Sequence, residues 1–280
     1  MNDGLSVVIP TRGESFLKET ITKLNSSKQK PDEVIIVINK QDLFKVENLK
    51  FNNLKIISSN FNDQVNKRID GFKSCNYNYV MQLDSDIIIG KNVISGLLEK
   101  IKKYPYPVSI SPKIMINYNL KKNRFISKFE YFLSRVFNEK NKNDSSENLN
   151  DLSTWFANPK EIKKTMEINY HHGSIVLFHN NDLITKNYYP YNYEKSYDED
   201  ILQSIILRNN GCKIIYCPEI KVESLTVNTY FDNFKSLIIY LYQLFKIKKY
   251  IMQTTNGKMY KLLIWFLYYS IKCFVKLFYI

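Results

Sequence analysis

Short runs of consecutive apolar residues recur along the N-terminal part of the chain, and each has the length of a strand buried on both faces of a sheet. These runs are 5–10, 33–38, 54–57 and 79–83. Segments with apolar residues at helical spacing accompany them at 14–27, 63–74 and 92–104. Strands that alternate with helices of about ten to fifteen residues are typical of a parallel sheet. The pattern predicts an α/β fold, with a doubly wound, Rossmann-like and mostly parallel sheet that has helices on both faces.

The C-terminal half continues this pattern less regularly. A further apolar strand is expected at 174–178, and a helix is expected to open at Asp198 and to end at Gly211. The polar stretch 138–153 has no periodicity and is expected to form a long loop, a kind of segment that often serves as a functional lid. We expect residues 1–230 to form one domain and residues 231–280 to form C-terminal amphipathic helices.

The net charge is +13, from 40 Lys and Arg against 27 Asp and Glu, and it is unevenly distributed. The segment 233–280 contains eight lysines and no acidic residue, so it supplies eight of the thirteen charges. A strongly basic balance favours an anionic partner. The sequence has neither an RNA-binding aromatic signature nor finger spacing, and the lysines of this segment lie among apolar residues. We therefore expect an anionic membrane surface, and no nucleic acid, as the partner.

The C-terminal lysines fall into two stripes on helices that turn about 100° per residue. The stripes are Lys235, Lys246 and Lys249, and then Lys258, Lys261, Lys272 and Lys276. The uncharged run inside the second helix has only ten residues, 262–271, whereas a spanning helix needs about 20. We expect these helices to lie on the membrane surface. The alternative is a helix pair packed on the domain, with its lysines facing water.

The expected location is the cytoplasm, at the inner face of the cytoplasmic membrane. Residues 1–10 have no basic region followed by a long apolar stretch, so they do not resemble a secretory signal. The four cysteines form no Cys-x-x-Cys pair. This spacing argues against a zinc ribbon and against a disulfide scaffold.

Polar residues follow three of the predicted strands, where open α/β sheets bind their ligands. Pro10 to Glu14 follow the first strand, Asn39 follows the second, and Asp84-Ser85-Asp86 follows the fourth. In extended chain, Asp84 and Asp86 point to the same side, and two such carboxylates repel each other. A hard divalent cation, Mg²⁺ or Mn²⁺, would relieve this repulsion. The alternative is a solvated acidic turn.

A second acidic cluster, Asp198-Glu199-Asp200, opens a predicted helix. Ser196 and Glu199 have the spacing of a capping box, which gives Glu199 a structural role. Asp200 lies one residue past the box and is not required by it. A carboxylate fixed at the start of a helix is a good general base, so Asp200 is the candidate.

The order and spacing of these motifs resemble those of inverting glycosyltransferases of family 2, which have the GT-A fold. The likeness covers about residues 5–224. It rests on Val7–Thr11, Pro31–Val37, Arg68 with Gly71, Leu83–Asp86, Asp198–Asp200, Arg208 with Gly211, and Tyr216–Pro218. The resemblance implies that Pro10, Thr11 and Glu14 line a nucleotide pocket and that Arg68 lies near the base or the diphosphate.

The same resemblance implies a catalytic arrangement. Asp84 would contact the ribose or the metal, and Asp86 would ligate Mn²⁺ or Mg²⁺. Asp200 would deprotonate the hydroxyl of the acceptor as it attacks the anomeric carbon. The implied activity is metal-dependent, inverting transfer of a sugar from a nucleotide-sugar donor to a glycan or lipid-linked acceptor, as in the synthesis of cell-surface polysaccharide or lipopolysaccharide.

The sequence departs from the family pattern in two places that concern ligands. The second strand of the family commonly ends in two aspartates, whereas Ile38 and Asn39 stand here. An amide both donates and accepts, so a UDP-sugar remains the favoured donor, with dTDP- and GDP-sugars as alternatives. A histidine that often follows the Tyr-x-Pro strand is missing, and Glu223 and Ser224 occupy that neighbourhood.

Two further readings keep the fold but change the function. A sugar nucleotidyltransferase would need a glycine-rich phosphate loop, and residues 11–14 contain one glycine. A non-catalytic scaffold that binds nucleotide sugar or membrane would not need all three aspartates. The pair His171-His172 either flanks the acceptor, gives a metal its third ligand, or is an ordinary pair of loop histidines.

Overall fold

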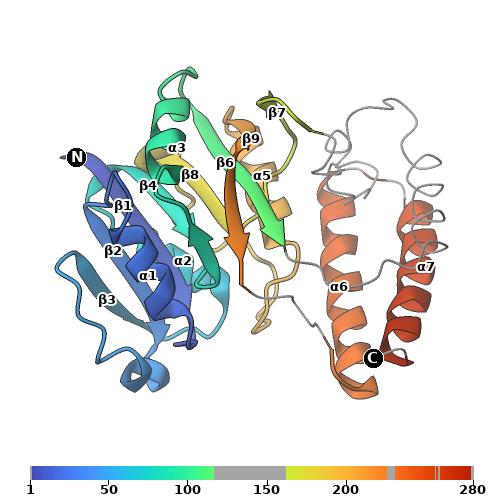
Figure 1. The fold of residues 1–280 in the computed structure, drawn as a ribbon. Coiled ribbons are helices and arrows are strands. Elements are labelled where there is room, and N and C mark those ends of the chain that lie inside the picture. Colours follow the sequence, from blue (N-terminus) through green and yellow to red (C-terminus); the bar gives the residue numbers. More distant parts are fainter. Residues whose placement is uncertain (1, 117–161, 226–230, 256, 258, 279–280) are drawn as a thin grey trace. The chain divides into compact units, whose positions relative to one another are not determined.

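The computed structural model describes residues 2–116, 162–225, 231–255, 257 and 259–278 (Figure 1). They fall into two compact units, the first with 2–116 and 162–225 and the second with 231–278, and each is described by itself. The loop predicted at 138–153 lies outside the described residues.

The first unit is built on one large sheet (Figure 1). Its strands are β1 (Asn2–Thr11), β2 (Glu33–Asn39), β3 (Leu54–Ser59), β4 (Tyr77–Leu83), β5 (Ile87–Ile89), β6 (Val108–Ile116), β7 (Met166–Glu167), β8 (Ile175–His179) and β9 (Lys213–Ser224). The strand order is β3-β2-β1-β4-β8-β6-β9-β5, and β7 pairs with β9. The α/β prediction is confirmed, and the four apolar runs of the N-terminal part are β1 to β4.

The sheet is mixed in direction. β1 is parallel to β2 and β4, β2 is parallel to β3, and β6 is parallel to β9. β8 runs antiparallel to β4 and β6, and β5 and β7 run antiparallel to β9. Because β8 is apolar and buried along Ile175–Phe178, its hydrophobic pattern is compatible with either direction of the strand. The apolar pattern therefore located this strand but could not orient it.

Helices cover both faces of this sheet, as predicted. The helices of this unit are α1 (Leu17–Asn25), α2 (Gln64–Phe72), α3 (Val93–Ile101) and α5 (Glu199–Asn209), with short 3₁₀ turns η1 (Lys40–Lys45) and η3 (Asn180–Asp182). Alternate residues of β1 face opposite sides. Val7 and Ile9 belong to the core cluster that includes α1 and α3, whereas Val8 packs in the cluster of α2. β1 is therefore buried from both sides.

The second unit contains two long helices, α6 (Phe234–Thr254) and α7 (Met259–Phe278). They pack together through aromatic pairs, including a hydrogen bond of 2.7 Å between the hydroxyls of Tyr240 and Tyr269. Of the helices in the described part of the chain, none has the length and hydrophobicity needed to cross a membrane.

The predicted lysine stripe on α7 is wrong at Lys261. We expected this side chain to face water or lipid, but it is only 5% exposed. Lys248 of α6 is buried as well, and its ammonium lies 4.7 Å from the centre of the Trp265 ring. A long aliphatic stem and a nearby aromatic face allow a lysine to be buried in this way. Lys258 lies outside the described residues, as does the side chain of Lys276.

Gly71 has a packing role that yields a stability prediction. It lies in α2 where the helix crosses the sheet, and a Cβ atom there would come within 2.3 Å of Val8 Cγ1 and 3.0 Å of Val37 Cγ2. Gly71→Ala should destabilise the protein by about 1–2 kcal/mol, because overpacking costs ~1–3 kcal/mol and alanine returns up to ~1 kcal/mol of helix propensity. Urea denaturation followed by circular dichroism measures the change.

Gly90→Ala is the matched control, because a Cβ at Gly90 would meet nothing closer than 4.0 Å. Its effect should stay within about 0.5 kcal/mol. Equal stability of the Gly71 and Gly90 variants would contradict the close approach of α2 to the sheet.

Candidate active site

The loop after β1 is tied to the acidic turn after β4. The Thr11 hydroxyl and the Ser85 hydroxyl both donate to Glu14, the latter at 3.2 Å from Oε2. The Lys67 ammonium donates to the Thr11 carbonyl at 2.9 Å, and burial lowers the pKa of this lysine. The structure therefore brings Thr11 and Glu14 to the edge of the sheet that carries Asp84 and Asp86, which we call the acidic pair.

Pro10 and Asn39 lie at the same edge. Pro10 is buried in β1 opposite Val37, and Asn39 ends β2. The Asn39 amide caps η1: its Oδ1 accepts from Gln41 N at 2.9 Å, and its Nδ2 donates to the Phe61 carbonyl at 3.3 Å. Each end of the amide thus already bonds a backbone group. The use of Asn39 to read a nucleotide base stays a prediction.

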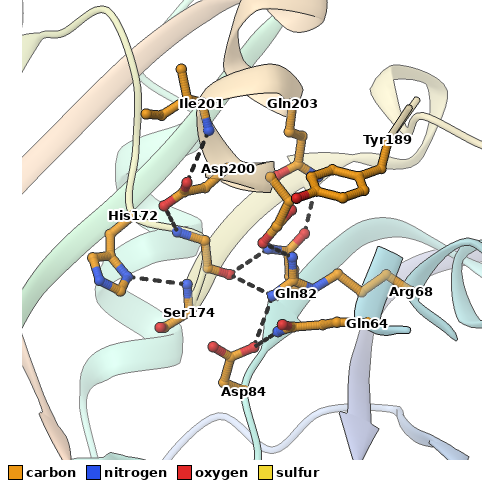
Figure 2. Close-up of polar contacts among 12 residues, drawn as sticks. Gln64, Arg68, Gln82, Asp84, His172, Ser174, Tyr189, Asp200, Ile201 and Gln203 are labelled. Atoms are coloured by element: carbon orange, nitrogen blue, oxygen red, sulfur yellow. Dashed lines mark hydrogen bonds and ion pairs between the residues drawn. The ribbon is translucent and has the colours of Figure 1, made fainter. Parts of the chain in front are cut away.

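The acidic pair occupies the turn that follows β4. Asp84 Oδ1 accepts from Gln64 Nε2 at 2.8 Å and from Arg68 Nη2 at 2.9 Å (Figure 2). Its Oδ2 accepts no hydrogen bond from any residue in the described ranges. Asp86 is half-buried, and its Oδ2 accepts from the Ser224 hydroxyl at 3.5 Å. One carboxylate is thus anchored through a single oxygen, and both side chains remain partly open to solvent.

Arg68 is the centre of a buried polar network (Figure 2). Its side chain is only 1% exposed and forms ion pairs with Asp84 and with Glu199. It also donates to the Gly173 carbonyl at 3.3 Å, and Glu199 Oε2 accepts from the Tyr188 hydroxyl at 2.9 Å. Burial alone lowers the pKa of Arg68, but the two carboxylates outweigh it and raise the pKa above its ordinary value. The structure thus places Arg68 between the acidic turn and α5.

The peptide group of Gly173 connects this network to Asp200. Its N–H donates to Asp200 Oδ2 at 3.2 Å, and its carbonyl accepts from Gln82 and Arg68 (Figure 2). A Cβ atom at Gly173 would lie 2.7 Å from Glu199 Oε1 and 3.0 Å from Asp200 Cβ. A glycine is therefore required for this close approach of backbone to the two carboxylates.

Asp200 has the properties of a general base. Burial, followed by the charges of Glu199 and Asp198, raises the pKa of Asp200 to about 7. The backbone N–H groups of Gly173 and Ile201, the latter at 2.9 Å from Oδ1, stabilise the ionised form and limit this rise. A carboxylate whose pKa lies near neutral pH binds a proton more strongly than an ordinary carboxylate does. A substantial fraction of it is still ionised at neutral pH and able to accept a proton.

The predicted capping box at the start of α5 is wrong. The helix begins at Glu199, and its N-cap is Asp198, which has a left-handed backbone conformation (φ 53°) and makes no side-chain cap. Ser196 is buried, and within the described ranges its hydroxyl has no hydrogen-bond partner. The Glu199 carboxylate bonds to the buried Arg68 instead of turning back to the chain. A buried guanidinium without a carboxylate is more costly than a helix end without a side-chain cap.

The two adjacent histidines have different environments. His171 is buried against the Phe178 ring, with 5.9 Å between ring centres, and burial lowers the pKa of His171 to about 3, so the ring is neutral. His172 is exposed, and its Nδ1 accepts from Ser174 N at 3.4 Å. Across the ranges that the structure describes, no cluster of three or more His, Cys, Asp or Glu side chains is placed to hold a metal.

Sequence reasoning did not single out four residues that build the site, namely Gln64, Lys67, Gly173 and Tyr188. Gln64 and Lys67 share α2 with Arg68, so their place within one turn of a predicted site residue was an available signal. Gly173 lies two residues before the apolar strand β8, and a glycine at such a place can permit a close backbone approach. Tyr188 had no signal of its own in a segment rich in tyrosine.

The Arg68 network makes a prediction about stability. Arg68→Met should lower the free energy of unfolding by about 3–5 kcal/mol, because it leaves the Glu199 carboxylate buried without its partner. Arg12→Met is the control, since the Arg12–Glu194 ion pair of 3.0 Å is exposed and should contribute less than about 1 kcal/mol. Chemical denaturation compares the two, and similar losses would contradict the role given to Arg68.

Comparison with known proteins places this chain in a family. The family model described as "Glycosyl transferase family 2" matches residues 6–158. Residues 1–349 of TarS from S. aureus share the fold, with a TM-score of 0.50 and 16% identity over 89% of this chain and 69% of that chain.

A second structure of TarS, in complex with UDP-GlcNAc, has a TM-score of 0.48 and 15% identity over 90% of this chain and 71% of that chain. A search among curated proteins found no match. The family match spans more than half of the sequence, and the resemblance inferred from the motifs is confirmed. This chain belongs to glycosyl transferase family 2 and is a glycosyltransferase.

Proposed function

We propose that the protein transfers a sugar from a nucleotide-sugar donor to a hydroxyl group of a glycan or lipid-linked acceptor, with inversion at the anomeric carbon. The reaction belongs to the synthesis of cell-surface polysaccharide or lipopolysaccharide. One observation carries the proposal: Asp200, with a pKa near 7, is joined through Gly173 and Arg68 to Asp84 of the acidic pair. A base and a cation-binding carboxylate are the two groups that such a transfer needs.

The donor binds at the carboxyl ends of β1, β2 and β4, where Pro10, Thr11, Glu14 and Asn39 lie. We favour a UDP-sugar, with dTDP- and GDP-sugars as the alternatives. The Asn39 amide oxygen already accepts one hydrogen bond, but it has two lone pairs and can accept a second from a base N–H. This keeps Asn39 available for base recognition without breaking its cap.

The acidic pair has the donor set that Mg²⁺ or Mn²⁺ prefers. These ions often bind proteins through one or two carboxylates, and phosphate oxygens of the substrate complete the shell. Asp86 and the Oδ2 atom of Asp84 would hold the cation, because Asp84 Oδ1 is taken by Gln64 and Arg68. When bound, the cation offsets the negative charge that develops on the departing diphosphate.

Asp200 acts on the acceptor. Two backbone N–H groups fix its carboxylate, so it presents a lone pair in a set direction. It accepts the hydroxyl proton as the acceptor oxygen bonds to the anomeric carbon and the bond to the diphosphate breaks on the opposite face. A single displacement of this kind inverts the configuration and needs no covalent intermediate.

We also propose that the protein works at the cytoplasmic face of the membrane. None of the four cysteines is in a disulfide bond, which suits a reducing compartment. The basic C-terminal helices supply the attraction to an anionic surface.

Asp200→Asn should lower the rate of acceptor-dependent nucleotide release by about 10²–10⁴-fold, because the amide cannot take the proton. Asp3→Asn, an exposed aspartate at the opposite end of β1, is the matched control and should retain the wild-type rate. The assay uses UDP-, dTDP- and GDP-sugars with glycan and lipid-linked acceptors. A wild-type rate in the Asp200 variant would remove this residue as the base.

The rate should also depend on pH. Only ionised Asp200 accepts a proton, so activity should rise between about pH 6 and pH 8, with a midpoint near the pKa of about 7. Asp198→Asn removes a charge that raises this pKa and should move the midpoint to lower pH. A profile that falls over this range, or a midpoint that Asp198→Asn raises, would contradict the assignment.

Metal dependence is tested separately. EDTA should abolish nucleotide release, and added Mn²⁺ or Mg²⁺ should restore it. Asp86→Asn should reduce the restored rate by roughly 10²–10³-fold, since charge on the diphosphate is then less well stabilised. Full activity in EDTA would show that the acidic pair has another purpose.

A further inference from the structure

The outward face of α6 combines apolar and cationic side chains. Ile238, Ile239 and Tyr242 are 45%, 47% and 56% exposed. Lys235, Lys246 and Lys249 are exposed on the same helix. At about 100° per residue, these six side chains project within an arc of about 100° around the helix axis. We name these six residues the α6 face.

This face is unusual for a helix of a water-soluble unit, because such helices bury their apolar stripe and expose the charged one. α6 does bury one stripe, which includes Leu237, Leu241 and Leu244. The exposed isoleucines therefore add a second apolar surface on the opposite side. Lys246 also lies over the Tyr242 ring, with 5.3 Å between its ammonium and the ring centre. Apolar contact area and positive charge thus occupy the same patch.

The charge of the surrounding segment identifies the partner. Residues 233–280 contain eight lysines and no acidic residue. A second copy of this chain would bring like charges together at this surface, which opposes association. An anionic bilayer offers the complementary charge and also takes up the isoleucine side chains, while the lysines extend toward the headgroups.

We propose that the α6 face is a membrane-binding site for anionic phospholipid, with α6 lying in the plane of the bilayer surface. Ile238, Ile239 and Tyr242 enter the interfacial region, and Lys235, Lys246 and Lys249 bind the headgroups. This proposal extends the proposed membrane location by naming the helix and the side chains responsible, and it does not depend on the transfer chemistry.

The structure selects α6 over α7. The exposed residues of α7 are apolar or aromatic on one side, including Leu263 and Leu267 at 58% and 66% exposed. Two of the four lysines expected on the membrane side of this segment have described side chains: Lys261 is buried and Lys272 is half-buried. Among the described residues of this unit, only α6 presents exposed lysines beside exposed apolar side chains. Charge complementarity is therefore strongest on α6.

The test is sedimentation of the full chain with vesicles of phosphatidylglycerol and phosphatidylcholine, compared with phosphatidylcholine alone. The wild-type protein should sediment with the anionic vesicles and be released by high salt, because surface attraction of lysines is screened. The triple variant K235Q/K246Q/K249Q should bind about 100-fold more weakly. The variant I238S/Y242S should also lose binding, although its charge is unchanged.

Three matched variants locate the effect. K18Q/K23Q/K30Q removes the same charge from exposed lysines of the first unit and should bind like the wild type. L263S/L267S on α7 should bind like the wild type as well. Asp200→Asn should keep full vesicle binding, so a failure of the membrane site and a failure of the proposed chemistry can be told apart.

Several outcomes would overturn the proposal. These are no binding of the wild-type chain to anionic vesicles, equal losses in the two triple-lysine variants, or a loss confined to the α7 variant. Self-association in sedimentation velocity that K235Q/K246Q/K249Q strengthens and I238S/Y242S abolishes would identify a second copy as the occupant. Circular dichroism of each variant checks that the helices remain folded, and the substituted positions on α6, on α7 and among the lysines of the first unit are exposed.

Discussion

The ion pairs of Arg68 are the interaction on which the rest of the site depends. A guanidinium that is 1% exposed cannot be left without carboxylates, and the two it uses come from distant parts of the chain. Asp84 lies at the end of β4, and Glu199 is the first residue of α5. The burial of Arg68 therefore fixes the turn that carries Asp84 and the helix α5, which carries Asp200, with respect to each other.

The same constraint explains the chemistry of Asp200. The Glu199 carboxylate is held by Arg68, and burial together with the charge of this carboxylate raises the pKa of Asp200 toward neutrality. Gly173 inserts its peptide between these groups, so its N–H orients the Asp200 carboxylate while its carbonyl accepts a hydrogen bond from Arg68. One network thus buries Arg68 and positions the proposed base.

The sequence predicted much of this molecule, for local reasons. β1 to β4 and the first three helices follow from apolar periodicity, and Asp84, Asp86 and Asp200 follow from their places at strand and helix ends. The antiparallel direction of β8 could not be predicted, because the hydrophobic pattern of a strand buried on both faces is compatible with either direction. The prediction that Glu199 caps its helix is wrong because its partner, Arg68, is 131 residues away and local sequence does not show such a contact. The prediction that Lys261 is exposed is wrong for a similar reason, since local periodicity does not show which lysine is buried by packing.

The most direct test of the central claim is a crystal structure of the protein with a nucleoside diphosphate and Mn²⁺. In that complex Arg68 should stay between Asp84 and Glu199, the cation should bind at Asp86, and Asp200 should still accept from Gly173 N–H. Separation of Arg68 from both carboxylates would contradict this role, because the network would then not support the site.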